Sequence, residues 1–150
     1  MGQTLANLTI HIIFSTKDRM PLIEPKYKEE LMAYLAGLVQ KLKANSLIIN
    51  GTQDHVHMLV EIPSSISVSE LMKFVKGNSS RWVNQSRDTK EIFAWQDGYA
   101  AFSVSKSAIP RVFDYIKNQE NHHKKRSFQD EVINFLEKHS ISYNEQYIWK

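Results

Sequence analysis

The sequence contains no cysteine, only five glycines and four prolines, and no long apolar run. Without cysteine there can be no disulfide framework, no thiolate metal site and no thiol nucleophile. A Gly-rich phosphate loop of the Walker type is also missing, so we expect no nucleotide cofactor. Residues 1–7 lack the charged-then-apolar pattern of a signal peptide, and no apolar segment approaches the length needed to cross a bilayer. These features predict a cytoplasmic protein with no membrane partner.

What is present suits one compact unit with a real hydrophobic core. The chain has 150 residues, of which 42% are hydrophobic and 23% are charged, as in ordinary globular proteins. No repeat, low-complexity tract or linker divides it. We therefore expect a single domain over residues 1–150.

The net charge of +3 is unevenly distributed along the chain. Residues 64–90 carry five basic and two acidic side chains, and residues 104–126 carry six basic and two acidic ones. Residues 91–103 and 127–150 are each net acidic. Two basic segments of this kind fit a nucleic-acid-binding surface, although two solvated helix faces would give the same charge pattern.

The hydrophobic pattern predicts alternating strands and helices. Apolar residues recur at helical spacing around Leu31, Leu35 and Leu38, and Ser67 with Glu70 forms a capping box that opens a second helix. The order β-α-β-β-α-β predicts a ferredoxin-like or RRM-like α+β fold, with an antiparallel sheet and appended C-terminal helices. The expected strands span residues 7–15, 46–50, 54–62 and 98–104, and the expected helices span 25–43, 68–87, 108–123 and 128–139.

The pattern His55-Val56-His57 lies on the third predicted strand. Alternate side chains of a strand share a face, so the two imidazoles point the same way and can bind one divalent metal ion if a third ligand is near. Asp54 could support that site by a hydrogen bond. Because His-x-His occurs often by chance, two structural histidines are the more common interpretation of the pattern alone.

A second candidate group lies on the basic helix after the last strand. Tyr115 and Gln119 are four residues apart and therefore share one helix face, which His122 continues. Taken alone, this pattern also fits a half-buried tyrosine beside an exposed glutamine.

Together the motifs resemble the single-tyrosine HUH transposases of the smallest bacterial insertion sequences, a group that includes the REP-associated tyrosine transposases. HUH stands for His-hydrophobic-His, which His55-Val56-His57 matches. The resemblance runs from about Leu8 to Trp149, and its motifs follow in the family's order. The stretches that carry it are residues 51–60 (GTQDHVHMLV), 74–81 (FVKGNSSR), 93–105 (FAWQDGYAAFSVS) and 115–123 (YIKNQENHH).

The resemblance implies a role for each of these groups. Tyr115 would attack a DNA phosphate and form a 5′-phosphotyrosine link, while His55, His57 and Gln119 would bind Mg²⁺ or Mn²⁺. The substrate would be single-stranded DNA with hairpins near the element ends. The protein would be a homodimer in which Tyr115 of one subunit meets His55 and His57 of the other.

Further residues are candidates for DNA contacts. Basic side chains on the second helix and after the nucleophile helix could bind phosphates, namely Lys73, Lys76, Arg81, Arg87, Lys124, Lys125 and Arg126. Trp95, Tyr99 and Trp149 could stack on bases, although core packing is the ordinary interpretation. His11 could border the active site, although a satisfied sheet histidine is the more common interpretation. His123 fits either a residue that approaches the metal or DNA phosphate or an exposed helix end.

Two other functions remain open at this point. One is a non-catalytic nucleic-acid-binding module on an RRM-like sheet, against which the missing Lys/Arg-Gly-Phe signature argues. The other is a domesticated relative with the same chemistry, such as a REP-associated transposase or a replication initiator. A covalent protein–DNA adduct would exclude the first, and genomic context would identify the second.

Overall fold

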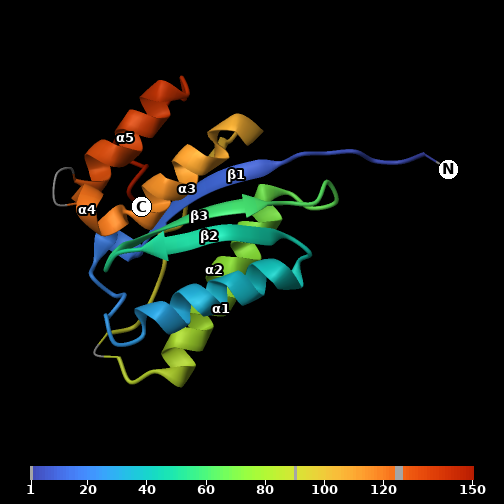
Figure 1. Ribbon diagram of the computed structural model, residues 1–150. Helices are drawn as coiled ribbons and strands as arrows, with labels where there is room; N and C mark the ends of the chain where they lie inside the picture. The colour runs from blue at the N-terminus through green and yellow to red at the C-terminus, as the bar shows by residue number, and fades with distance from the viewer. Residues whose placement is uncertain (1, 90, 124–126) are drawn as a thin grey trace.

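The computed structural model describes residues 2–89, 91–123 and 127–150. Four antiparallel strands form one sheet in the order β2-β3-β1-β4 (Figure 1). This strand order confirms the predicted ferredoxin-like α+β fold and puts β3, with its two histidines, inside the sheet rather than at an edge. The strands are β1 (Thr9–Ser15), β2 (Asn45–Gly51), β3 (His55–Glu61) and β4 (Ala100–Ser103).

Helices cover both faces of this sheet, with α1 and α2 on one face and α3, α4 and α5 on the other (Figure 1). The helices are α1 (Lys28–Lys41), α2 (Val68–Ser86), α3 (Ile109–Lys117), α4 (Gln119–His123) and α5 (Phe128–Lys138), with short 3-10 turns at Lys17–Arg19 and Lys106–Ala108. None of these described helices combines the length and hydropathy that a membrane span requires.

Alternation along β3 separates the core from the candidate site. Val56, Met58 and Val60 are fully buried in the main core, against the side chains of α1 and α2. His55 and His57 therefore point to the opposite face, as a strand requires. A second, smaller cluster lies on that face, where α5 packs on β1 and β4, and consists of Ile13, Phe102, Phe128, Val132 and Leu136.

The N-terminus of α2 confirms the predicted capping box. Ser67 Oγ accepts the backbone N–H of Glu70 at 3.0 Å. This bond satisfies one of the amide donors that a helix leaves unpaired at its start. The first helical residue, Val68, and the end near Arg87 agree with the expected range to within one residue.

The C-terminal half of the chain departs from the expectation at one helix. The predicted helix over residues 108–123 is wrong as a single element, because it breaks at Asn118 into α3 and α4. Asn118 leaves the helical conformation, and its side-chain amide donates to the Asp114 carbonyl at 2.8 Å, as does its own backbone N–H at 3.1 Å. Asparagine competes for backbone groups in this way, which is why it ends helices more readily than it continues them. The predicted fourth strand, 98–104, is also shorter in the structure.

Candidate active site

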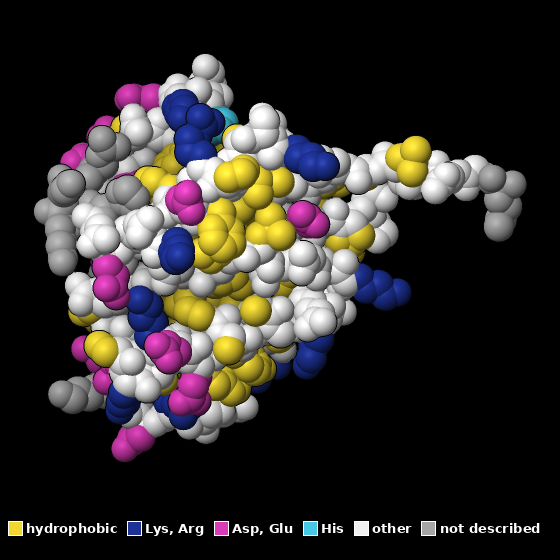
Figure 2. Space-filling view, viewed as in Figure 1, with side chains coloured by type: hydrophobic (Ala, Val, Ile, Leu, Met, Phe, Trp, Pro, Cys, Tyr) yellow, Lys and Arg dark blue, Asp and Glu magenta, His cyan; other side chains and the backbone are white. Residues whose placement is uncertain are grey.

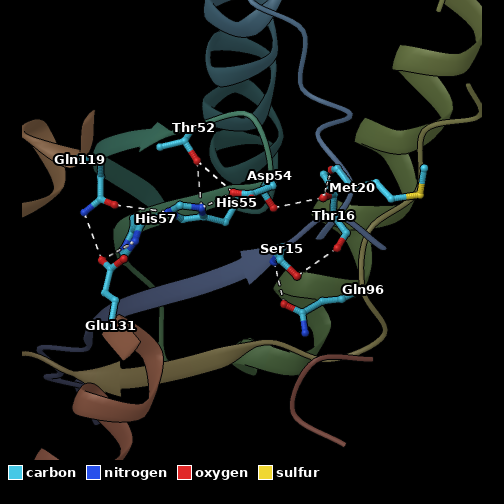
Figure 3. Close-up of polar contacts among 10 residues, drawn as sticks. All are labelled: Ser15, Thr16, Met20, Thr52, Asp54, His55, His57, Gln96, Gln119 and Glu131. Carbon is cyan, nitrogen blue, oxygen red and sulfur yellow. Dashed lines mark hydrogen bonds and ion pairs between the residues drawn. The ribbon is translucent and has the colours of Figure 1, made fainter. Parts of the chain in front are cut away.

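The two histidines of β3 lie beneath the C-terminal helices. His55 and His57 are both fully buried, and their ring centroids are 5.4 Å apart. Gln119 is equally buried, and Glu131 of α5 is 2% exposed. Figure 3 shows Gln119 and Glu131 facing the histidine pair from the helical side of the sheet. Four polar side chains thus share one enclosed space on the face of the sheet opposite α1 and α2.

His55 is held by the turn that joins β2 to β3. Its Nδ1 lies 2.7 Å from Asp54 Oδ1 and 2.9 Å from Thr52 Oγ1. Thr16 fixes Asp54 in turn, because its backbone N–H donates to the Asp54 carbonyl at 2.8 Å. A carboxylate only accepts hydrogen bonds, so in the neutral ring Nδ1 carries the hydrogen and the Nε2 lone pair faces the site. Asp54 therefore supports His55 by a hydrogen bond, as expected.

Gly51 leaves no room for a side chain in the same turn. A Cβ at Gly51 would lie 2.4 Å from the backbone oxygen of His55, closer than atoms can approach. The hairpin can bring its strands together here only with glycine, and this close approach sets the position of His55.

Polar groups of other described residues lie at both ring nitrogens of His57. His57 Nδ1 shares a hydrogen bond of 2.8 Å with His11 Nε2, and His57 Nε2 lies 3.1 Å from Glu131 Oε1. Burial, followed by the neighbouring His57, holds the pKa of His11 well below its ordinary value of 6.5. His11 is therefore a neutral, hydrogen-bonded sheet histidine, as the more common interpretation had it, and it also contacts His57 of the candidate site.

Tyr115 and Gln119 converge on Glu131, although the helix breaks between them. The Tyr115 hydroxyl donates a hydrogen bond to Glu131 Oε1, and the Tyr115 ring lies 5.9 Å from the His57 ring. Gln119 Nε2 donates to Glu131 Oε1 at 3.4 Å and to the Tyr115 carbonyl at 3.3 Å. The side chains predicted to carry the chemistry are thus neighbours in space.

The donor set fits a divalent metal ion. Because Gln119 Nε2 donates toward Glu131, its Oε1 is turned to His55 Nε2 at 3.4 Å. With hydrogen on His55 Nδ1, both facing atoms offer lone pairs, and a cation between such atoms is favourable. Ligand atoms of His55, His57 and Glu131 also lie within 4.8 Å of one another. Imidazole nitrogen and amide or carboxylate oxygen are suitable ligands for Mn²⁺, and oxygen ligands are preferred by Mg²⁺.

Glu131 is the site residue that the sequence interpretation missed. It lies on the face of α5 that also carries Phe128, Val132 and Leu136, which are 6–7% exposed. A carboxylate at that position of an amphipathic helix is unusual, because a buried charge needs compensating partners. This exception to the apolar face is the signal that could have found it.

The basic side chains proposed for DNA contact have different surroundings. Lys76 donates to the carbonyls of Asp97 and Gly98 at 3.0 and 2.9 Å, and burial lowers its pKa. Arg87 forms an ion pair with Glu30 of α1. Both side chains thus connect parts of the fold, whereas Lys73 and Arg81 are exposed.

The aromatic candidates for base stacking differ in their exposure to solvent. Trp95 is buried and donates to Ser79 Oγ at 2.9 Å, and Trp149 packs beside the small cluster under α5. Tyr99 is 37% exposed with Lys76 over its ring. Five further candidates lie outside what the structure describes. They are Lys124, Lys125 and Arg126 and the side chains of His122 and His123.

Helix α3, which carries Tyr115, is docked on the sheet of its own chain. Helix α3 packs against β2 of its own chain, where Asn50 Nδ2 donates to the carbonyls of Ile116 at 2.9 Å and Lys117 at 3.3 Å. Ile116 is fully buried. Tyr115 consequently lies beside His57 of the same chain, and sites shared between subunits stay a prediction.

Known proteins are similar to this chain in sequence and in fold. Residues 4–119 match the family model described as IS200-like transposase. The transposases for insertion sequence element IS200 of Salmonella typhimurium and Salmonella typhi are each 32% identical to this chain over 124 residues, which cover 79% of this chain and 81% of theirs.

Two solved structures are similar in fold. A candidate transposase from Deinococcus radiodurans superposes with a TM-score of 0.62 at 21% identity, covering 79% of this chain and 96% of that one. A REP-associated tyrosine transposase bound to a REP hairpin superposes with a TM-score of 0.61 at 12% identity, covering 82% and 74%. Both confirm the fold, and the match of the family model over most of the chain confirms the resemblance seen in the motifs. The chain belongs to the IS200-like transposase family.

Proposed function

We propose that this transposase cleaves and rejoins single-stranded DNA at the ends of an insertion sequence, with Tyr115 as its nucleophile. The ion, Mg²⁺ or Mn²⁺, is held by His55, His57 and Gln119. The observation that carries the proposal is the convergence of the Tyr115 hydroxyl, both histidines of β3 and Gln119 in one buried cluster. A tyrosine, two imidazoles and an amide in that relation fit phosphoryl transfer better than they fit a purely structural role.

In the proposed reaction one phosphodiester replaces another. The Tyr115 oxygen attacks the phosphorus, the bond to the 3′ oxygen of the preceding nucleotide breaks, and that oxygen leaves as a 3′-OH with the proton that tyrosine gives up. Attack by a second 3′-OH reverses these steps, rejoins DNA and restores the phenol. Because bond types are conserved, the exchange requires no nucleotide triphosphate.

The residues around Tyr115 compensate for the weakness of phenol as a nucleophile. A tyrosine has an ordinary pKa of about 10 and is largely protonated at neutral pH. A divalent ion bound between the histidines would polarise the scissile phosphate and offset charge in the transition state. Phe135 and His57 contact the Tyr115 ring at 5.5 and 5.9 Å between centroids and hold it in position.

A cleft lies beside the N-terminal end of α5, next to the turn that holds His55. This cleft of about 570 Å³ is lined by Thr52 and Asp54, which hold His55, and by Phe128, whose ring stacks on His55 at 4.2 Å. Lys28 also lines this cleft, where its ammonium group pairs with Glu120 at 3.4 Å. We propose that hairpin DNA is the substrate, in line with the REP hairpin bound by the structurally similar REP-associated transposase.

The direct test is covalent capture of labelled DNA. Single-stranded oligonucleotides that carry candidate hairpin ends and a 5′ flank are incubated with the protein and Mn²⁺, then separated under denaturing conditions. We expect a slower protein band that carries the label from the 3′ side of the cleavage point. A fully duplex oligonucleotide of the same sequence should give no band. If no candidate end forms an adduct while the protein binds the hairpin, the chain is a DNA-binding module rather than a strand transferase.

We further propose that the protein is a homodimer. β2 is an edge strand, so its outer backbone groups are available to pair with another strand. Leu47, Ile48 and Ile49 of β2 are only half-buried, as are Val112 and Phe113 of α3. Figure 2 shows a hydrophobic surface that extends over α3 and β2 in this region. Apolar side chains beside the edge of a sheet form the kind of surface that a second copy covers.

Mixing two inactive variants tests whether the dimer shares its sites. Tyr115→Phe and His57→Ala proteins are combined after a step in which subunits exchange, and exchange is measured with differently tagged chains. If sites are shared between subunits, as the family resemblance implies, a mixed dimer has one site with neither lesion, and we expect cleavage to return. If cleavage stays at background although exchange is shown, Tyr115 acts with His57 of its own chain, whose ring lies 5.9 Å from the Tyr115 ring.

A further inference from the structure

Helix α5 places the carboxylate of Glu131 beside the histidine pair of β3. Glu131 lies in the first turns of α5. Ser127 caps the N-terminus of this helix, because its Oγ accepts the backbone N–H of Asp130 at 3.2 Å. The residues that match the transposase family model end at residue 119, before this helix begins. Any role of Glu131 is therefore additional to the His-His-Gln set that the family resemblance implies.

Burial distinguishes Glu131 from an ordinary surface glutamate. The side chain is 2% exposed, although it lies among the apolar residues that attach α5 to the sheet. An acidic group is rarely buried unless charged or hydrogen-bonding partners compensate for its lost hydration. The partners here are His57 Nε2 at 3.1 Å, Gln119 Nε2 at 3.4 Å and the Tyr115 hydroxyl. These three residues belong to the candidate site.

The spacing of these atoms is that of ligands around one small ion. Atoms that bind a divalent ion at about 2.1 Å in an octahedral shell lie roughly 3 Å from their neighbours in that shell. Glu131 Oε1 lies 3.1 Å from His57 Nε2, and Gln119 Oε1 lies 3.4 Å from His55 Nε2. In Figure 3 Glu131 approaches from α5, below the sheet, while Gln119 approaches beside Thr52. Two pairs of adjacent ligand atoms are thus already formed.

We infer that Glu131 is a further ligand of the divalent ion held by the two histidines and Gln119. An ionised carboxylate adds a negative charge to three neutral ligands, so the ion is bound more tightly than by the neutral set. The same carboxylate accepts the Tyr115 hydrogen bond and so holds the nucleophile beside the ion. Correct docking of α5 thereby becomes a condition for loading the metal. The inference rests on the metal site in the proposed function.

Mn²⁺ affinity of the DNA-free protein tests this role without reference to activity. Calorimetric titration compares the wild type with Glu131→Gln, which keeps the shape and removes the charge. We expect the Kd to weaken at least tenfold, about 1.4 kcal/mol. The matched control is Glu137→Gln, an exposed glutamate on the same helix, whose Kd should equal that of the wild type. Circular dichroism in EDTA verifies that each variant is folded.

The outcomes separate this inference from the proposed function. If the wild type binds Mn²⁺, His57→Ala does not, and Glu131→Gln binds as the wild type does, Glu131 is not a ligand and the proposed function stands. Tighter binding by Glu131→Gln would also overturn the inference, because the carboxylate would then be a competitor of the ion. No Mn²⁺ binding by the folded wild type contradicts the metal site itself. If Glu131→Gln does not fold, Glu131→Asp replaces it, with a smaller loss expected because the charge remains while the carboxylate withdraws by one methylene.

Discussion

Replacing Tyr115 by phenylalanine is expected to lower the yield of adduct and the rate of cleavage by a factor on the order of 10³ or more. The substitution deletes the attacking oxygen and leaves the ring, which packs at 5.5 Å from Phe135 and 5.9 Å from His57. Hairpin binding should therefore stay near the wild-type affinity. Adduct yield on a denaturing gel measures the first effect, and a mobility shift measures the second.

A control tyrosine makes this result specific. Tyr147 is 60% exposed near the C-terminus, so Tyr147→Phe should form adduct as the wild type does. Removing the Tyr115 hydroxyl also removes one hydrogen bond to the buried Glu131, which should lower the free energy of unfolding by about 1–3 kcal/mol. Adduct at the wild-type level in Tyr115→Phe would show that another residue attacks the DNA.

Loss of the histidine ligands or of the metal ion is expected to reduce cleavage as strongly as loss of the Tyr115 hydroxyl. His55→Ala, His57→Ala and treatment with EDTA should each reduce cleavage to background, because the ion cannot stay beside the phosphate without the imidazoles. Gln119→Ala should retain part of the activity, since water can replace one neutral ligand. Cleavage rates at increasing Mn²⁺ concentration measure all of these effects.

The EDTA experiment does not depend on how well a variant folds. Added Mn²⁺ should restore the treated wild type, while the alanine variants should stay inactive at every concentration. His139→Ala, an exposed histidine at the end of α5, is the matched control and should behave as the wild type. Full cleavage in metal-free buffer would show that the histidine pair is structural.

Local patterns were sufficient to predict most of the fold. Alternation along β3 separated Val56 and Met58 from the histidines, and that separation is what positions the site. Element ends were less predictable, because a strand ends where its neighbour stops pairing. The break at Asn118 depends on one side-chain bond to the Asp114 carbonyl, which the residue type permits but does not require.

The polar partners of the site depended on long-range packing. His11 is a diagonal neighbour of His57, because β1 pairs with β3 in a register that sets His11 opposite Leu59 and Ile13 opposite His57. Glu131 reaches the histidines only because α5 docks on that face of the sheet. Neither contact follows from spacing along the chain, and for this reason Glu131 was not among the predicted ligands.

Mapping the covalent adduct by mass spectrometry tests the central claim most directly. The protein is trapped with a hairpin oligonucleotide in Mn²⁺, the DNA is trimmed by nuclease, and the tryptic peptides are sequenced. The proposed chemistry predicts one modified peptide, with the remaining nucleotide joined through its 5′ phosphate to Tyr115. A nucleotide on a different residue, or one joined to Tyr115 through its 3′ phosphate, would contradict it.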